Sequence, residues 1–141
     1  MRLYLYLTLV IIATLSACQT NKVKPPTDAI ANLEAFEQKE KFDADTALLY
    51  PGIADTAHKA QFTKLINLAA DDFKVLIESG HNTECAYHNA MNDGLKRFKP
   101  YYINTEDRER ICQYYEEMMD IVGLDNNGGI LTNWIYGEEM N

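Results

Sequence analysis

Histidine and cysteine side chains gather in one short stretch of the 141-residue chain, at His81, Cys85 and His88. Positions separated by three or four residues share one face of a helix, so these side chains could face the same way, and Cys112 could supply a fourth ligand to zinc. Zinc sites with two cysteines usually offer a close cysteine pair, which this chain lacks, and His81 stands at an expected helix boundary. The pattern therefore favours no metal site, and His88 is expected at the edge of the core with a hydrogen-bond partner.

Carboxylates form the second candidate cluster, at Glu116, Glu117 and Asp120. Two suitably separated carboxylates are enough for glycosidase chemistry. Helical periodicity, however, places these three opposite or beside the apolar stripe of their helix, on a face that is normally solvated and where Arg110 or Lys96 could pair with them. The chain also has no motif for a nucleophilic serine, a phosphate-binding loop or a dinucleotide site. The sequence therefore favours a protein without catalytic residues and without a cofactor.

Tyrosine is the most frequent aromatic residue, and it occurs in two adjacent pairs, Tyr101-Tyr102 and Tyr114-Tyr115. Neighbouring residues on a regular element cannot both face inward, so one ring of each pair is expected at the surface. Exposed tyrosine among acidic residues is typical of protein interfaces, although such rings can also simply lie flat on the surface. The sequence therefore predicts a binding surface that includes Tyr101, Tyr102, Tyr114, Glu116, Glu117 and Asp120.

The first 17 residues have the pattern of an export signal. Arg2 supplies a positive charge, the stretch from Leu3 to Leu15 is apolar and uncharged, and small residues follow it. The apolar run is shorter than the roughly 20 residues that span a bilayer, and the chain becomes polar directly after Cys18. This pattern favours a cleaved signal peptide over a permanent transmembrane helix.

The residues Leu15-Ser16-Ala17-Cys18 resemble the lipobox of bacterial lipoproteins. The resemblance implies cleavage before Cys18, acylation of that cysteine with fatty acids such as palmitate and, because Gln19 rather than aspartate follows, an outer-membrane location facing the periplasm. Two or more acyl chains hold a protein stably on a bilayer. The alternative is an ordinary secreted protein whose signal ends in cysteine. With Cys18 assigned to lipid, Cys85 and Cys112 remain as a pair in an oxidising compartment and are expected to form a disulfide.

Acidic residues outnumber basic ones by 21 to 13, which gives a formal net charge of −8 at pH 7. Phosphate binding needs a clustered basic face, so nucleic acid is not an expected partner. An acidic surface is also repelled by anionic lipid headgroups, so we expect membrane attachment to come from the acyl chains. A basic protein partner would be attracted.

Amphipathic stretches position these residues and predict a single all-α domain of four to five helices over residues 29–141, after a flexible tether at residues 18–28. Apolar residues recur at steps of three and four, and Gly80 and Gly123 supply helix ends. The expected helices cover about 28–41, 55–79, 83–99, 105–122 and 130–136. Between the first two, Pro51-Gly52 predicts a turn under which Leu48, Leu49 and Tyr50 are expected to pack.

Two stretches, LLYPG at residues 48–52 and DRERICQYYEEMMDIVGL at residues 107–124, the second followed by NWIYG at residues 133–137, resemble a bacterial family known only as a domain of unknown function. The resemblance covers most of the mature domain. It transfers no activity, because none is assigned to that family.

Together these patterns predict a lipid-anchored periplasmic protein that binds another protein and is not an enzyme. One specific form is an inhibitor or immunity protein against a cell-wall-degrading enzyme, since the chain resembles type VI amidase immunity proteins in size, helicity, charge and location, though not in any motif. A second interpretation is a small periplasmic enzyme or ligand-binding protein that uses the acidic residues or the histidines. A third is a structural component of the envelope.

Overall fold

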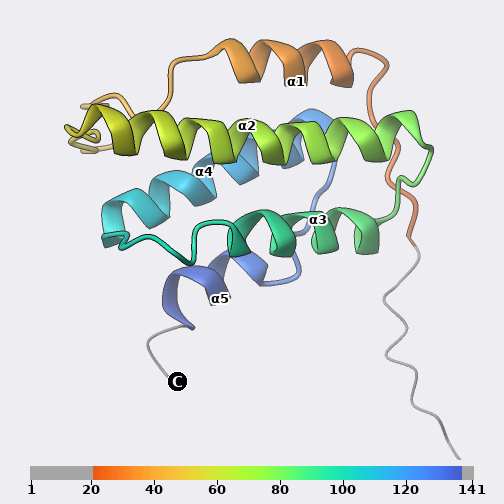
Figure 1. Cartoon of the computed structure of the whole chain (residues 1–141). Coiled ribbons are helices and arrows are strands. Elements are labelled where there is room, and N and C mark those ends of the chain that lie inside the picture. Colours follow the sequence, from red (N-terminus) through yellow and green to blue (C-terminus); the bar gives the residue numbers. More distant parts are fainter. Residues whose placement is uncertain (1–20, 138–141) are drawn as a thin grey trace, which may run out of the picture.

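The computed structural model describes residues 21–137, and this part of the chain folds into five helices (Figure 1). They are α1 (Ala29–Gln38), α2 (Thr56–Glu78), α3 (Glu84–Lys96), α4 (Thr105–Val122) and α5 (Ile130–Tyr136). Residues 21–137 contain no strand, only two isolated bridges. The predicted all-α class is confirmed. No helix in this part of the chain is both long and apolar enough to cross a membrane.

The longest helix, α2, runs through the middle of the domain. In Figure 1, α1 lies along one side of α2, α3 lies along the other, and α4 crosses behind it. The main contacts of α4 are with α1, α2 and α5, whereas α3 packs on α2 and α5. With 23 residues, α2 is about 35 Å long, so its two ends mark the two ends of the domain.

Local capping explains where three of the helices begin. The side chains of Asp55, Thr83 and Asn104 accept hydrogen bonds from backbone amides in the first turns of α2, α3 and α4. Each such cap is worth about 1 kcal/mol of stability. Helix α4 ends at Gly123, whose φ of 72° is readily adopted only by glycine.

Helix α1 ends earlier than the sequence predicts, at Gln38 rather than near Lys41. The reason is Lys41 itself, which turns back under the helix and is only 1% exposed. Its ammonium donates to the carbonyl oxygens of Phe36 (2.6 Å), Lys39 (3.1 Å) and Glu37 (3.3 Å) at the end of α1, where carbonyls lack the amide partners of a continuing helix. Burial lowers the pKa of Lys41 to about 8. A lysine side chain thus takes the place of a glycine cap.

The predicted disulfide between Cys85 and Cys112 is wrong, because Cys112 is a free, buried thiol. Cys112 lies on the face of α4 that packs on α5, with its sulfur 3.9 Å from the carbonyl oxygen of Leu131. Cys85 lies in the first turn of α3, which packs on α2 and α5. The sulfur of Cys112 therefore faces α5 and forms no disulfide.

The chain before α1 is held against the domain from Asn21 onward. The Val23 amide donates to the carbonyl oxygen of Asn82 (3.0 Å), and the Glu84 amide donates to the carbonyl oxygen of Asn21 (3.0 Å). The side chain of Val23 is buried. Residues 21–24, for which a flexible tether was predicted, therefore line the turn between α2 and α3, while Cys18 lies outside the described residues.

Candidate functional site

The connection between α1 and α2 closes on itself at Asp45 and Tyr50. Their backbones exchange two hydrogen bonds, of 2.8 and 2.9 Å. The carboxylate of Asp45 also accepts from the amides of Ala47 and Leu48, as in an Asx turn. This closure forces Leu49 into the left-handed region, with a φ of 53°. A non-glycine residue there costs of the order of 1 kcal/mol, so the loop is held in place by contacts elsewhere.

Gly52 closes the base of the same loop. Its φ is 79°, and a side-chain carbon at this position would lie 2.7 Å from the backbone nitrogen of Ala44. Only glycine fits such a contact. The Ile53 amide then donates to the carbonyl oxygen of Phe42 (3.0 Å), so the two ends of the loop are held side by side.

Tyr50 fastens the loop to α4. Its side chain is buried, and its hydroxyl donates to the carboxylate of Asp107 (2.6 Å). Burial and this carboxylate raise the pKa of Tyr50 well above its usual range. The phenol therefore remains protonated and keeps donating at any physiological pH.

Arg110 lies between two tyrosine rings. The centre of its guanidinium is 5.5 Å from the ring centroid of Tyr50 and 4.9 Å from that of Tyr114. Its Nε donates to the Tyr114 hydroxyl (3.2 Å), and Nη1 donates to the Gln113 side chain (3.0 Å). The Tyr114 hydroxyl also accepts from the Phe42 amide (2.8 Å). The guanidinium therefore joins the loop, α4 and the end of α1 in one rigid unit.

Two leucines project from this unit into solvent. Leu49 is 89% exposed and Leu48 is 51% exposed. The expectation that both pack under the turn is wrong, because the left-handed Leu49 directs the chain outward while Tyr50 takes the inward position. Only Tyr50 packs as predicted.

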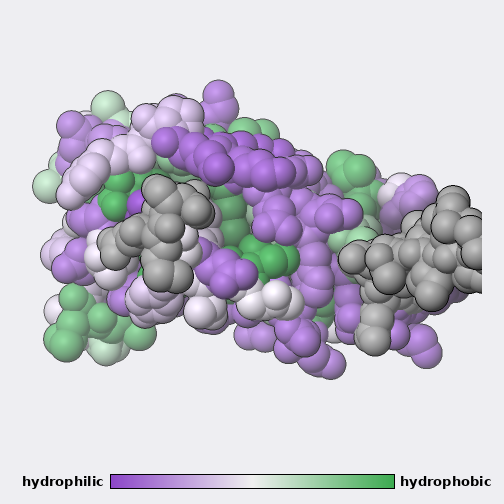
Figure 2. Space-filling model, turned by 90° about the horizontal axis from the view of Figure 1, so that it is seen from below, coloured by the Kyte–Doolittle hydropathy of each residue, from purple (hydrophilic) through white to green (hydrophobic). Residues whose placement is uncertain are grey.

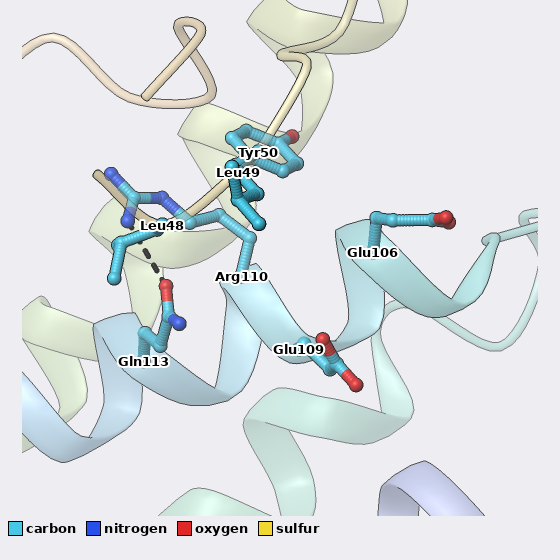
Figure 3. Close-up of a pocket in the computed structure, with 7 residues that line it drawn as sticks. All are labelled: Leu48, Leu49, Tyr50, Glu106, Glu109, Arg110 and Gln113. Atoms are coloured by element: carbon cyan, nitrogen blue, oxygen red, sulfur yellow. Dashed lines mark hydrogen bonds between the residues drawn. The ribbon is translucent and has the colours of Figure 1, made fainter. Parts of the chain in front are cut away.

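A shallow cleft of about 200 Å³ lies between the loop and α4. It is lined by Leu48, Leu49, Tyr50, Glu106, Glu109, Arg110 and Gln113. Figure 3 shows the loop residues beside Arg110 and Gln113, with the two glutamates further along α4 toward its first turn. Since Arg110 is engaged with the two tyrosines, Glu106 and Glu109 give the outer edge of this site a negative charge. The arrangement offers apolar side chains with an acidic border, which suits binding to a protein surface.

The surface predicted from the tyrosines and acids does not form one patch. Tyr102 is 91% exposed and Tyr101 is half-buried, as expected for that pair, but Tyr114 is buried along with Tyr115. Tyr114 and Tyr115 can both be buried because α4 packs on α1 and α2 as well as on α5, so that more than one face of the helix is covered.

The acids of that prediction lie further along α4. Glu117 pairs with Lys39 at 2.6 Å, while Glu116 and Asp120 are exposed. Asp120 is roughly 20 Å from the start of α4, near which Tyr102 lies. Tyr102 and Asp120 therefore lie toward opposite ends of α4.

In the part of the chain that the structure describes, the histidines and cysteines do not come together as a metal site. The Nε2 atom of His88 lies 2.6 Å from the carbonyl oxygen of Asn126, and the Nδ1 atom of His81 lies 3.0 Å from the Ser79 hydroxyl. Within residues 21–137, no group of three or more histidine, cysteine or acidic side chains is arranged to hold a metal ion.

Comparison with known proteins identifies the family of this chain. Residues 24–139 match the family described as "Domain of unknown function (DUF4844)". The chain belongs to this family. The DUF4844 domain is also similar to the crystal structure of a DUF3571 family protein from Acinetobacter baumannii AYE, with 31% identity and a TM-score of 0.73. The similarity covers 79% of this chain and 91% of that one. Among curated proteins, none matches.

The sequence resemblance and the site coincide in the DUF4844 domain. The segments 48–52 and 107–124, which carried the resemblance, meet at the cleft through Tyr50 and Asp107. The exposed leucines are the residues that sequence reasoning missed. The available signal was an apolar pair beside Pro51-Gly52 in a segment without helical or strand periodicity, where nothing in the pattern requires burial.

Proposed function

We propose that this protein is a lipid-anchored module of the bacterial cell envelope that binds another protein without a catalytic step. The observation that carries the proposal is the exposure of Leu48 and Leu49 on a loop fixed by Tyr50 and Arg110. The lipobox-like residues 15–18 support the anchor. Figure 2 adds that one face of the domain is predominantly hydrophilic, with its hydrophobic residues gathered in separate clusters.

The energetics of the loop favour an interface role. Burying a leucine side chain is worth about 1.5–3 kcal/mol, so removing both leucines from water in a complex would contribute several kcal/mol. The loop is closed by backbone hydrogen bonds and tied to α4, so little conformational freedom is lost when a partner binds. Leu49 is thus held, in a strained conformation, where a partner protein could bury it.

The border of the site indicates the chemistry of the partner. Glu106 and Glu109 are exposed beside the leucines, and the whole chain is acidic. A complementary surface would have an apolar pocket flanked by lysine or arginine. Such charges mainly accelerate association, and salt screens them. A basic enzyme that degrades the cell wall is one partner of this kind, which would make the protein an inhibitor or immunity protein.

The binding function is tested with residues 19–141 as bait against envelope and secreted fractions. The wild-type bait is expected to retain one partner in stoichiometric amount, and Leu49→Ser is expected to lose it. Leu68→Ser is the matched control, because Leu68 is an exposed leucine on α2 away from the loop. Equal retention by the Leu49 and Leu68 variants, or no retained partner, would contradict the proposal.

The anchor is tested separately in the full-length chain. Mass analysis of the membrane fraction is expected to find Cys18 at the amino terminus carrying acyl chains. Cys18→Ser is expected to release the protein from that fraction. An unmodified Cys18 would rule out the lipoprotein part and leave the binding part to be judged on the bait experiment alone.

A further inference from the structure

We propose that the domain rests on the membrane by the end where α2 meets α3, so that the Leu48-Leu49 loop points away from the bilayer. The proposal depends on the lipid anchor proposed above. It assigns a membrane-facing surface and a partner-facing surface to opposite ends of the molecule.

The first step of the argument is the docked N-terminal segment. Lys22 and Thr83 form an antiparallel bridge, flanked by the backbone bonds of Asn21 and Val23 to the turn between α2 and α3. The Asn21 side-chain amide also donates to the carboxylate of Glu84 (3.2 Å). Val23 is 8% exposed. The chain is therefore fixed to this end of the domain at Asn21.

The second step is the short distance from that point to the anchor. Only Gln19 and Thr20 separate Cys18 from Asn21. Three residues of extended chain span at most about 10 Å. A free segment reaching to Asp28 would instead allow roughly 35 Å. Whatever path residues 18–20 take, an acylated Cys18 holds the turn between α2 and α3 close to the headgroups.

The third step is the position of the exposed loop. Asp43, just before the loop, forms an ion pair with Lys59 in the second turn of α2, so the loop lies beside the N-terminal end of that helix. Figure 1 shows this loop and the N-terminal segment at opposite ends of α2. The length of α2 therefore separates the leucines from the anchored end by about 35 Å.

Charge at the anchored end is compatible with lipid. Lys22 and Lys24, both exposed, flank the buried Val23 in a chain whose net charge is −8. Each lysine near an anionic surface gains about 1 kcal/mol. Glu78 and Glu84 also lie at this end, so the local balance is close to neutral rather than repulsive.

The orientation is tested with the acylated full-length protein reconstituted in vesicles of phosphatidylcholine and phosphatidylglycerol. A fluorescent amino acid replaces either Ser79, at the anchored end, or Ala47, in the loop; both positions are exposed. Energy transfer to an acceptor in the headgroups is expected to be several-fold more efficient from position 79. Equal or reversed efficiencies would overturn the proposal. Intact mass of the same sample shows whether Cys18 is acylated, which separates failure of the anchor from failure of the orientation.

A variant pair tests the docked segment directly. Val23→Asp is expected to release it, raising transfer from position 47 toward that from position 79. Thr27→Asp adds the same charge at an exposed position nearby and should preserve the difference. Hydrogen exchange gives an independent measurement, since the amides of Val23 and Glu84 should be protected in the wild type. Exchange of these two amides at the rate of an unstructured chain would refute the docked segment.

Discussion

Replacing Gly94 by alanine should destabilise the domain, and replacing Tyr115 by phenylalanine should remove most of that cost. Gly94 lies in the middle of α3, where an added methyl group would come within 2.2 Å of the Tyr115 hydroxyl oxygen. Tyr115 is fully buried, and its hydroxyl has no hydrogen-bond partner within residues 21–137. The glycine thus provides the space that a tyrosine hydroxyl needs where α3 and α4 approach.

The magnitude follows from two opposing effects. Alanine in place of glycine inside a helix stabilises by about 1 kcal/mol, whereas forcing an extra methyl into a packed core costs about 1–3 kcal/mol. We expect a net loss of up to about 2 kcal/mol for Gly94→Ala. In the Tyr115→Phe background the nearest atoms are the ring carbon Cζ at 3.4 Å and the Ala69 methyl at 3.6 Å, which are ordinary contacts. There the same substitution should be neutral or stabilising by up to about 1 kcal/mol.

The assay is urea unfolding of residues 19–141, followed by circular dichroism, for the wild type, both single variants and the double variant. Tyr115→Phe alone should change the free energy of unfolding little, because it removes a buried hydroxyl without a partner. The coupling between the two substitutions should be about 2 kcal/mol. An equal effect of Gly94→Ala in both backgrounds would refute the steric explanation.

Four further predictions concern the loop and the free thiol. Leu49→Asn should raise the free energy of unfolding by about 0.5–1 kcal/mol, because asparagine tolerates the left-handed φ of 53°; a loss of stability in urea unfolding would contradict this. Tyr50→Phe should cost about 1.5–3 kcal/mol through loss of the bond to Asp107 and should speed hydrogen exchange at the Tyr50 amide, whereas unchanged exchange would disprove the fastening role. Burial, together with the nearby carboxylates of Glu116 and Glu109, raises the pKa of the Cys112 thiol from its usual value of 9.0 to about 12. The unfolded chain therefore loses this proton at lower pH than the folded chain does, and the free energy of unfolding should fall as pH rises from about 9 toward 12. Without reductant, maleimide at pH 8 should modify Cys112 only after unfolding in urea, and modification of the folded protein would contradict its burial.

The positions of the helices were predictable from sequence because their signals are local. Apolar residues at steps of three and four define each buried stripe, and Asp55, Thr83 and Gly123 act within their own helices. The bounds of α5, residues 130–136, were predicted without error. The export signal and the lipobox resemblance are likewise properties of a short segment, and they stay predictions because residues 1–20 lie outside the part described.

Features that depend on distant neighbours were not predictable in the same way. Tyr50 and Asp107 are 57 residues apart, so nothing near Leu49 indicates that tyrosine rather than leucine will be held inward. The burial of Tyr114 required knowledge that α4 packs on α1, α2 and α5, and the free state of Cys112 required knowledge that its face turns toward α5. Periodicity tells which residues of a helix share a face, but only the packing of helices decides what covers that face. The sequence by itself therefore determined the helices, and the tertiary structure decided which side chains were left for a partner.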